Sequence, residues 1–487
     1  MHLSDLTTLL GVPNGPAPDR SITSVTEDSR RAVPGALFVA APGVRSDGHD
    51  HAAEAAAKGA VAILGEHAGL AELNGLPYFH VSNARKALGI VAHALAGNPT
   101  CGMTVIGVTG TNGKTSSVFL IKSILSACGL PAGSFGTLGY TFGDTTVAAD
   151  HTTPFGEDLA ALFRRASDAG VRHVAMEASS HAIAQERIAG IEFMAALFTN
   201  LTQDHLDYHA TMDAYCEAKL GLFRRIEGAG RFTVVNADDP HAPRFVEASR
   251  VPCHTFGRQG DCRATKIRAD LKRTSFHLTS PWGTAEIETS LLGAHNVMNV
   301  LGAITVCAAL GQPLEAIARG VAALKAVPGR FEHVESAHPF QVVVDYAHTE
   351  DGLRNVLNAA RAICKERVIV VFGCGGDRDK TKRPKMAAAA AQLADYSIIT
   401  SDNPRTEDPE RILLDIESGI QHAGKRKTDD YLVFLDRAEA IQRGIDMARP
   451  GDLVLIAGKG HEDYQIVGTT RVRFDDREVA RTILGAG

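Results

Sequence analysis

Long apolar runs and an N-terminal targeting pattern are both missing from this sequence. The apolar stretch Leu301–Leu310 is too short to span a bilayer and predicts a buried helix. Met1–Asp5 is not a basic region leading into an apolar run, so no signal peptide is expected. The 8 cysteines are scattered without a C-x-x-C pair, which is typical of reduced, buried thiols. These absences predict a cytoplasmic protein without membrane insertion.

The sequence also lacks an excess of positive charge, since its formal net charge is −6 at pH 7. Without a basic excess or an aromatic RNA-reading pattern, the sequence gives no case for nucleic-acid binding. What is present is ordinary for a globular protein with a sizeable core, at 45% hydrophobic and 22% charged residues. The length of 487 residues predicts about three domains.

One glycine-rich stretch, Gly107–Thr115, organises the rest of the chain. An apolar, β-branched segment precedes it and a helical spacing of apolar residues follows, which predicts a strand, a loop and a helix in that order. Such a loop directs backbone N–H groups and a helix N-terminus at one point, which favours a phosphate. Lys114 could neutralise phosphate oxygens and the Thr115 hydroxyl could ligate Mg²⁺. The alternative is a plain strand-to-helix turn.

The glycine spacing of this loop departs from the common P-loop. That motif has a glycine five positions before the glycine of Gly-Lys-Thr. Val108 occupies the position here, and the glycines fall at 107, 110 and 113 instead. The sequence therefore predicts nucleotide binding by a variant loop.

The first region, residues 1–98, contains short strands and helices. Residues 51–68 hold an alanine-rich helix and then the strand Ala60–Leu64, and a later helix covers Ala84–Ala96. The breaker cluster Gly97–Pro99 ends that helix, and we place a domain boundary there. Because we find no nucleophile–base pair and no metal-ligand cluster in this region, it is predicted to be a smaller α/β module that holds substrate.

The second region, residues 99–327, alternates strands and helices and predicts a mostly parallel sheet with ligands at the carboxyl ends of its strands. Glu177 ends one candidate strand, and His205 follows another that ends at Asn200. A carboxylate and an imidazole beside phosphates could hold Mg²⁺. Zinc also accepts these ligands, but no tightly spaced ligand set is visible. For His205, a helix-capping or core histidine is the alternative.

The third region, residues 328–487, predicts a second, doubly wound Rossmann-like sheet. Its apolar strands, each ending in a polar or glycine-rich loop, are Gln341–Asp345, Arg367–Phe372, Tyr396–Thr400 and Asp452–Ala457. We exclude a dinucleotide, because Arg378 stands where the G-x-G-x-x-G pattern requires its third glycine. Arg378 and Arg405 follow strands at the same sheet edge, where two guanidiniums suit a carboxylate.

At this point the sequence resembles the Mur ligases of bacterial cell-wall synthesis over essentially its whole length. The motifs that carry the resemblance are Gly107–Thr115, Met176–His181, Thr199–Leu201 with Asp204–His209, Asp345–Thr349 and Gly458–Glu462. The stretch Asp402–Arg405 has the form found in members that add meso-2,6-diaminopimelate. Lysine-adding members lack the arginine.

The resemblance implies an α/β fold of three domains that bind, in order, the UDP end of one substrate, ATP, and the incoming amino acid. It implies a cytoplasmic, monomeric, ATP-dependent ligase of peptidoglycan precursor synthesis. This enzyme would add meso-diaminopimelate to UDP-N-acetylmuramoyl-L-alanyl-D-glutamate through an acyl phosphate. Its cofactors would be ATP and two Mg²⁺.

The resemblance also implies site residues by position. The ATP-binding set is Gly110, Thr111, Asn112, Gly113, Lys114, Thr115, Ser116, Asn296, Arg330 and Asp345. The catalytic set is Lys114, Glu177, His205 and Lys219, with the metal held by Thr115, Glu177, His205 and carbamylated Lys219. The UDP-substrate set is Ser29, Val44, Arg45, Ser46, Thr152, Thr153, Ser179, Gln185 and Arg187. The diaminopimelate set is Arg378, Asp402, Asn403, Pro404, Arg405, Gly458 and Glu462.

Alternatives remain at this stage. By its sequence context alone, Lys219 is an ordinary helix lysine whose usual role is a solvated charge. Folylpolyglutamate synthases share a similar loop and ligase chemistry, but they should lack the Asp402–Arg405 stretch. A P-loop switch protein would hydrolyse ATP slowly and bind a protein partner, and it would leave Arg378 and Arg405 without a role.

Overall fold

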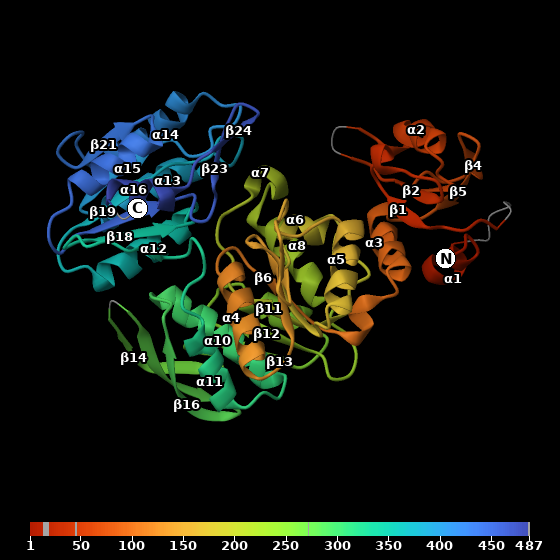
Figure 1. The fold of residues 1–487 in the computed structure, drawn as a ribbon, viewed down its shortest axis with the longest axis horizontal. Coiled ribbons are helices and arrows are strands. Elements are labelled where there is room, and N and C mark those ends of the chain that lie inside the picture. Colours follow the sequence, from red (N-terminus) through yellow and green to blue (C-terminus); the bar gives the residue numbers. More distant parts are fainter. Residues whose placement is uncertain (13–18, 44–45, 271, 486–487) are drawn as a thin grey trace.

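The computed structural model describes residues 1–12, 19–43, 46–270 and 272–485, which form five β-sheets (Figure 1). The first sheet has the order β1-β2-β3-β5-β4 and is parallel except at the β4–β5 pair. Its strands are β1 (Ser24–Thr26), β2 (Ala36–Ala40), β3 (Ala62–Gly65), β4 (Glu72–Leu73) and β5 (Leu76–His80). The accompanying helices are α1 (Asp5–Leu10), η1 (Ser29–Arg31), η2 (Gly48–His51), α2 (Ala52–Ala57), α3 (Ala84–Leu95) and η3 (Pro99–Gly102).

The second sheet has eight strands in the order β13-β12-β11-β6-β10-β7-β8-β9, and its β7–β8–β9 edge is antiparallel. Its strands are β6 (Thr104–Thr109), β7 (Ala132–Gly136), β8 (Gly139–Phe142), β9 (Thr145–Val147), β10 (His173–Glu177), β11 (Phe193–Phe198), β12 (Phe232–Asn236) and β13 (Cys253–Phe256). The helices around it are α4 (Lys114–Ala127), α5 (Gly156–Asp168), α6 (Ser180–Ala184), α7 (Leu206–His209), α8 (Met212–Phe223), α9 (Ala242–Ala248), α10 (Ala294–Ala309) and α11 (Leu314–Ala323).

Alternation along β6 places its side chains in two separate cores. Ile106 and Val108 pack with α4, α10 and α11 on one face of the sheet. Val105 packs with α5 and α8 on the other face. Because both faces are covered, β6 is a continuous apolar run, as expected for a central parallel strand. The loop that follows β6 is therefore held between two rigid layers.

A three-stranded antiparallel sheet follows the central one and was not predicted from the sequence. Its strands are β14 (Arg263–Ala269), β15 (Thr274–Ser280) and β16 (Gly283–Thr289). Phe276, Leu278 and Ile287 join the core formed by α4, α10 and α11. The edge strand β14 is largely exposed, so it has little of the hydrophobic alternation that identifies a strand.

The C-terminal sheet has the order β17-β18-β22-β19-β20-β21, with only β17 antiparallel. Its strands are β17 (Glu332–Val334), β18 (Gln341–Asp345), β19 (Val368–Phe372), β20 (Tyr396–Thr400), β21 (Tyr431–Phe434) and β22 (Leu453–Ala457). The helices are α12 (Glu350–Ile363), α13 (Lys382–Leu393), α14 (Pro409–His422), α15 (Arg437–Asp446) and α16 (Asp476–Ile483). A hairpin of β23 (Tyr464–Val467) and β24 (Thr470–Arg473) follows β22.

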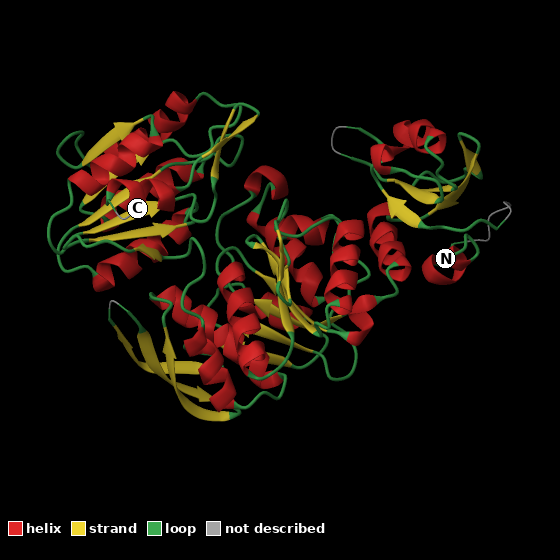
Figure 2. Cartoon of the chain, viewed as in Figure 1, coloured by secondary structure: helices red, strands yellow, loops and turns green. Residues whose placement is uncertain are grey.

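The α/β fold class predicted from the sequence is confirmed, and Figure 2 shows helices beside each of the large sheets. In Figure 1 the N-terminal and C-terminal parts lie on opposite sides of the central sheet. The domain limits at 98 and 327 stay predictions, and each falls between consecutive sheets. The predicted alanine-rich helix followed by a strand is present as α2, which ends at Ala57, and β3, with Gly59 at φ +94° in the turn between them. Within the described residues, no helix is long and apolar enough to cross a membrane.

Candidate active site

The glycine-rich loop forms the predicted turn between β6 and α4. Gly110 has φ +149° and Gly113 has φ +83°, conformations that side chains disfavour. Space is also restricted, because a Cβ on Gly110 would lie 1.9 Å from Thr199 Oγ1. A Cβ on Gly113 would lie 2.2 Å from Asn299 Oδ1. The two glycines are therefore required both by the turn and by the close approach of β11 and α10.

Two lysines converge on this loop. Lys114 Nζ donates to the carbonyls of Gly110 at 2.9 Å and Thr111 at 2.8 Å. Lys219 Nζ, on α8, donates to the same Gly110 carbonyl at 2.8 Å. Lys219 is only 1% exposed, which contradicts a solvated surface role. Burial, and then the neighbouring Lys114, hold the pKa of Lys219 well below its ordinary value.

Glu177 and Thr115 lie together at the carboxyl end of β10. Thr115 Oγ1 donates to Glu177 Oε1 at 3.0 Å and accepts from Arg330 Nη2 at 3.1 Å. The backbone N–H of Thr137 also donates to Glu177 Oε1, at 2.9 Å. A hydroxyl and a carboxylate in contact are hard oxygen donors of the kind that Mg²⁺ prefers. We call Gly107–Thr115, Glu177 and Lys219 the phosphate-loop site.

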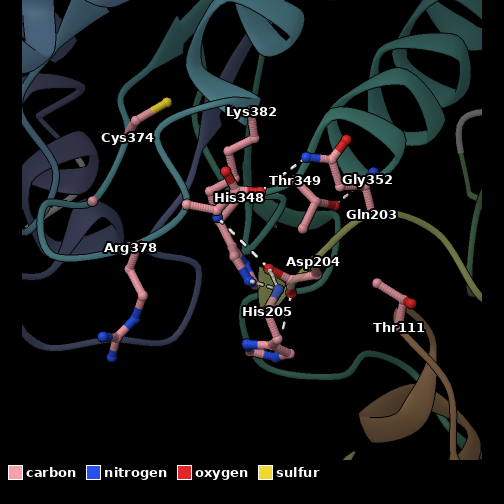
Figure 3. Close-up of polar contacts among 12 residues, drawn as sticks. Thr111, Gln203, Asp204, His205, His348, Thr349, Gly352, Cys374, Arg378 and Lys382 are labelled. Atoms are coloured by element: carbon pink, nitrogen blue, oxygen red, sulfur yellow. Dashed lines mark hydrogen bonds and ion pairs between the residues drawn. The ribbon is translucent and has the colours of Figure 1, made fainter. Parts of the chain in front are cut away.

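His205 belongs to a cluster around the buried carboxylate of Asp204, which links the central and C-terminal parts (Figure 3). His205 Nε2 lies 3.4 Å from Asp204 Oδ2, and His348 Nε2 lies 3.8 Å from it. Lys382 Nζ, at the start of α13, lies 3.9 Å from Asp204 Oδ1. Burial alone would raise the pKa of Asp204, but these neighbours hold it below its usual range. Asp204 and His348 belong to motifs that carry the family resemblance, but no role was predicted for either of them or for Lys382.

A cavity of about 620 Å³ lies beside the phosphate-loop site and is lined by both large sheets' loops. Asn112 and Thr115 line it from the loop, and Asn296 lines it from α10. Arg330 and Asp345 line it from the C-terminal part. The predicted ATP-binding residues from the central and C-terminal regions thus meet at one cavity. Its size is in the range of small-molecule sites.

The Asn296 and Asp345 side chains are fixed by their own hydrogen bonds. Asn296 Nδ2 donates to Leu292 O at 2.8 Å, and Asn296 Oδ1 accepts from Asn299 at 3.0 Å. The Asp345 carboxylate accepts from the backbone N–H groups of Phe331 and Ala347, each at 2.7 Å. These groups are held in place by the chain before any ligand arrives. Asn296 lies inside the first turn of α10, whose N-cap position is Gly293.

A second group of predicted residues surrounds the far side of Glu177. Thr153 Oγ1 donates to Glu177 O at 2.7 Å, and Thr152 Oγ1 lies 3.1 Å from Thr137 Oγ1. Arg187 donates to Thr153 O at 3.0 Å and to Gln185 Oε1 at 2.7 Å. Ser179 lies in the same group, 3.5 Å from Thr153 Oγ1. Five of the nine predicted UDP-substrate residues are therefore neighbours.

The remaining predicted UDP-substrate residues belong to the first sheet. Ser29 is buried and its hydroxyl donates to Glu54 Oε2 at 2.6 Å. Ser46 accepts a backbone hydrogen bond from Gly43 at 3.0 Å. Val44 and Arg45 lie outside the described residues. The structure brings none of the described members of this group into contact with the Thr153 group.

Three potential metal ligands, Asp47, His49 and His67, also meet in the N-terminal part, where the sequence showed no such cluster. His49 Nδ1 lies 2.6 Å from Asp47 Oδ1, and His67 Nε2 lies 3.4 Å from Asp47 Oδ2. The two imidazole rings stack at 3.6 Å with an interplanar angle of 6°. Ring nitrogens coordinate a metal in the ring plane, and two parallel stacked planes cannot both contain one ion. This arrangement favours a carboxylate shared by two histidines over a metal site.

The predicted amino-acid residues gather at the carboxyl edge of the C-terminal sheet, and we call Arg378, Asp402–Arg405, Gly458 and Glu462 the amino-acid pocket. Arg405 has φ +53°, and its Nη1 donates to Gly376 O at 2.8 Å. Arg378 is exposed and donates to Asp377 O at 2.9 Å. Among the described residues, neither arginine has a carboxylate within ion-pair distance. Both guanidiniums therefore keep their charge available for a ligand.

Sequence reasoning missed one buried cation in this pocket. Lys459 is 0% exposed, and its Nζ lies 3.0 Å from Asn403 Oδ1 and 3.2 Å from Glu462 Oε2. Asn403 Nδ2 in turn donates to Glu462 Oε2 at 2.9 Å. The sequence did contain a sign of a special position, because Lys459 stands between two glycines just after the end of a strand. A lone lysine in a loop is usually solvated, so the pattern was not singled out.

Comparison with known proteins places this geometry in a family. Three family models match the chain: the Mur ligase family catalytic domain over residues 21–95, the Mur ligase middle domain over 108–307, and the Mur ligase glutamate ligase domain over 329–460. The UDP-N-acetylmuramoyl-L-alanyl-D-glutamate–2,6-diaminopimelate ligase of Geobacillus kaustophilus is 45% identical over 478 residues, or 96% of each chain.

Solved structures agree with these matches. One structure of a UDP-N-acetylmuramoyl-L-alanyl-D-glutamate–2,6-diaminopimelate ligase superposes with a TM-score of 0.68 at 33% identity, covering 96% of this chain and 95% of the other. A folylpolyglutamate synthase of Mycobacterium tuberculosis, solved with ADP and AMPPCP, has a TM-score of 0.66 at 18% identity, covering 81% and 94%. The second likeness shows a shared fold alone. The chain belongs to the Mur ligase family.

Proposed function

We propose that this chain is an ATP-dependent ligase that joins meso-2,6-diaminopimelate to UDP-N-acetylmuramoyl-L-alanyl-D-glutamate in peptidoglycan precursor synthesis. Relatives that match almost the whole chain carry the corresponding enzyme name. The observation that carries the proposal is the pairing of two sites. The central part carries a phosphate loop that receives two lysines, and the C-terminal part carries two arginines that have no carboxylate partner among the described residues. The first suits a nucleotide, and the second suits an amino acid.

The reaction needs activation, because a carboxylate would have to expel an oxide. The D-glutamate carboxylate oxygen attacks the γ-phosphorus of ATP, the bond to the bridging oxygen breaks, and ADP leaves. The resulting acyl phosphate is attacked by the neutral amine of diaminopimelate, and a tetrahedral intermediate expels phosphate. The amine nitrogen loses a proton as the amide forms. No protein nucleophile is required, so catalysis is by positioning and charge.

Lys114 would be the main cation for this charge. In the chain as described, its ammonium donates to two loop carbonyls. A triphosphate bound on the loop N–H groups would offer stronger, charged acceptors within the reach of the same side chain. Desolvation lowers the pKa of Lys114, and phosphate oxygens beside it would stabilise its charged form. Asn296, Arg330 and Asp345 would contact the adenosine part from the cavity walls.

The donors around Thr115 fit Mg²⁺. The Thr115 hydroxyl and the Glu177 carboxylate are already in contact, and both are hard oxygen ligands. When bound, Mg²⁺ would offset the charge of the two anions that react. Glu177, Thr115 and His205 would hold it, and a second ion would be held through Lys219. Arg330, which donates to Thr115 Oγ1, would have to release that hydroxyl.

Lys219 fits a carbamylated residue. A buried amine beside another lysine is driven toward its neutral form, and only the neutral amine adds CO₂. Carbamylation would replace a buried positive charge by a carboxylate next to Lys114. An anionic oxygen at that position would serve as a ligand for the second Mg²⁺.

The substrate ends would be divided between the outer parts of the chain. Thr152, Thr153, Ser179, Gln185 and Arg187 would contact the muramoyl dipeptide, and Ser29 with Val44, Arg45 and Ser46 would contact the uridine end. Arg405 would take the distal carboxylate of diaminopimelate, which lysine lacks, with Arg378 beside it. Glu462 would take the distal ammonium. Arg405 left without that carboxylate would disfavour lysine.

One assay separates the candidate functions. Purified chain is mixed with ATP and Mg²⁺, and phosphate release is measured with UDP-N-acetylmuramoyl-L-alanyl-D-glutamate, with diaminopimelate, and with both. We expect release only with both. A folylpolyglutamate synthase would not use the UDP substrate, and a switch protein would release phosphate slowly whatever is added. Gel filtration and cell fractionation would test the proposed monomeric state and cytoplasmic location.

A further inference from the structure

Lys459 is a completely buried ammonium in a pocket proposed to receive an ammonium from the substrate. It follows β22, and its Nζ donates to Asn403 Oδ1 at 3.0 Å and to Glu462 Oε2 at 3.2 Å. Asn403 Oδ1 also accepts from the backbone N–H of Ile466 at 3.0 Å, which ties the β23–β24 hairpin to the same group. Lys459 therefore sits where the loops after β20 and β22 meet the hairpin.

The charges around Lys459 do not balance. Two carboxylates face it, those of Asp402 and Glu462. Arg437 is nearby, but it is committed to Asp476 through contacts of 2.7 Å from both Nε and Nη2. Asp402 Oδ2 is buried and has no hydrogen-bond partner among the described residues. Among the described residues, Arg378 and Arg405 make no ion pair with Asp402 or Glu462, so Lys459 alone faces these two carboxylates and one negative charge is left in excess around it.

The other groups that face Glu462 do not remove this excess. The hydroxyl of Tyr346 lies 3.5 Å from Glu462 Oε1 and is neutral. The Tyr464 ring lies 5.6 Å from Lys459 Nζ and can stabilise only the cation. One positive charge from a ligand would therefore balance the cluster. An isolated charge in a buried site is costly, so the imbalance favours a ligand that carries an ammonium.

We propose that Lys459 is a positioning and specificity-determining residue, which holds Glu462 and Asn403 in a single arrangement and leaves the Asp402–Glu462 pair with the one negative charge that a ligand ammonium would balance. The inference rests on the proposed function. Lys459 itself does not contact the reacting atoms. Its role is to keep Glu462 ionised beside Asp402 and to keep the second Glu462 oxygen directed at the ligand.

The charge on Glu462 is the consequence that can be tested. Burial, and then the Asp402 carboxylate, raise the pKa of Glu462, while Lys459 lowers it. Removing the ammonium would leave two close carboxylates without their cation, and one of them would bind a proton. A protonated Glu462 is a weaker acceptor for the ligand ammonium. Raising the pH would ionise it again and restore part of the binding.

The test compares Lys459→Met with Lys459→Arg in the full chain, using phosphate release with saturating ATP and UDP substrate. In Lys459→Met we expect the KM for diaminopimelate to rise at least tenfold at pH 7 with kcat within about threefold. That KM should fall between pH 7 and pH 9, while the wild-type KM stays flat. Lys459→Arg should restore the flat profile. The exposed Lys365→Met is the matched control.

A second measurement guards against misfolding. Glu462→Gln and the double variant Lys459→Met/Glu462→Gln complete a double-mutant cycle, and the double variant buries fewer unpaired charges. We expect its KM for diaminopimelate to match that of Glu462→Gln alone. Additive losses, a flat pH profile in Lys459→Met, or equal KM changes for all three substrates would each overturn the inference. Wild-type chain that shows no diaminopimelate-dependent release would instead overturn the proposed function.

Discussion

The phosphate-loop site and the amino-acid pocket differ in which groups supply their polar contacts and in the sign of the charges those groups carry. In the phosphate-loop site, lysines from α4 and α8 share one carbonyl, and the backbone supplies most of the polar groups. In the amino-acid pocket, side chains from loops after β19, β20 and β22 supply charges of both signs. The first arrangement suits any polyphosphate of the right shape. The second suits a ligand with both an ammonium and a carboxylate, and our proposal therefore assigns selectivity among amino acids to this pocket.

The largest expected effect comes from removing the main cation of the phosphate-loop site. Lys114→Met should lower kcat/KM about 1000-fold for every amino acid tested, because the lysine stabilises charge in the transition state. Phosphate release with diaminopimelate and with lysine measures this. Lys122 lies on the same helix but donates a hydrogen bond to Thr141, so the kcat/KM of Lys122→Met should stay within about twofold of the wild-type value. A loss of kcat/KM for only one amino acid would contradict the expectation that the phosphate-loop site acts equally on all amino-acid substrates.

Arg405→Ala should produce the selective loss that Lys114→Met does not. We expect kcat/KM for diaminopimelate to fall about 100-fold, since a charged, bidentate contact with a carboxylate is removed. The KM values for ATP and the UDP substrate should change by less than about threefold. Arg426→Ala, an exposed arginine in the same sheet unit, is the control. Equal losses of kcat/KM for all three substrates would contradict the assignment of Arg405 to diaminopimelate binding.

Glu407, two residues after Arg405 and outside the amino-acid pocket itself, should make the surrounding loops sensitive to acid. Burial alone would raise the pKa of Glu407, but hydrogen bonds from Arg383 and from the backbone of Asp377 lower it to about 2. Because the folded-state pKa lies below the unfolded value, this stabilisation is full above about pH 5 and is lost as the pH falls toward 2.

Urea unfolding of Glu407→Gln tests this acid dependence. At pH 7 the variant should be about 2 kcal/mol less stable than wild type, and the difference should shrink as the pH is lowered from 5 to 3. Glu410→Gln, at an exposed position nearby, should show no such change. A difference that is independent of pH would mean that Glu407 stabilises the pocket by packing rather than by its charge.

The smallest expected effect concerns the contact between the two regions. Gln203 Nε2 donates to Asp379 Oδ2 and Thr381 Oγ1, each at 2.9 Å, and Lys385 donates to its oxygen. Gln203→Ala should raise the KM for diaminopimelate about fivefold, the loss expected from one net hydrogen bond. Gln259→Ala, at an exposed position, is the control. No change in KM would show that this contact does not align the two sites.

The central strands could be predicted almost to the residue. Gln341–Asp345 and Tyr396–Thr400 match their predicted bounds, because both faces of these parallel strands are buried and the apolar run stops where the strand does. The sheet β14–β16 was missed, since a half-exposed antiparallel edge leaves a weak pattern. The strand predicted at Ala60–Leu64 correctly required the preceding helix to end before it, and α2 ends at Ala57, ahead of the turn at Gly59.

Only part of the candidate site could be predicted from the sequence. The loop Gly107–Thr115 is contiguous, so its chemistry can be read from neighbouring residues. The burial of Lys219 and Lys459 depends on segments that are distant in sequence, and a helix or loop lysine gives no local sign of it. The resemblance to a family supplied Lys219 but not Lys459. Asp204 and Lys382 likewise meet only because the central and C-terminal parts are in contact.

The 620 Å³ cavity has a pharmacological consequence, because its walls come from both regions. A small molecule that fills it against Asn296 and Tyr346 would contact the central and the C-terminal parts at once, and it would compete with a nucleotide bound there as proposed. Its residence time would then depend on the contact between these two parts as well as on the cavity wall. Substitutions that weaken that contact would shorten the residence time even where the cavity wall is unchanged.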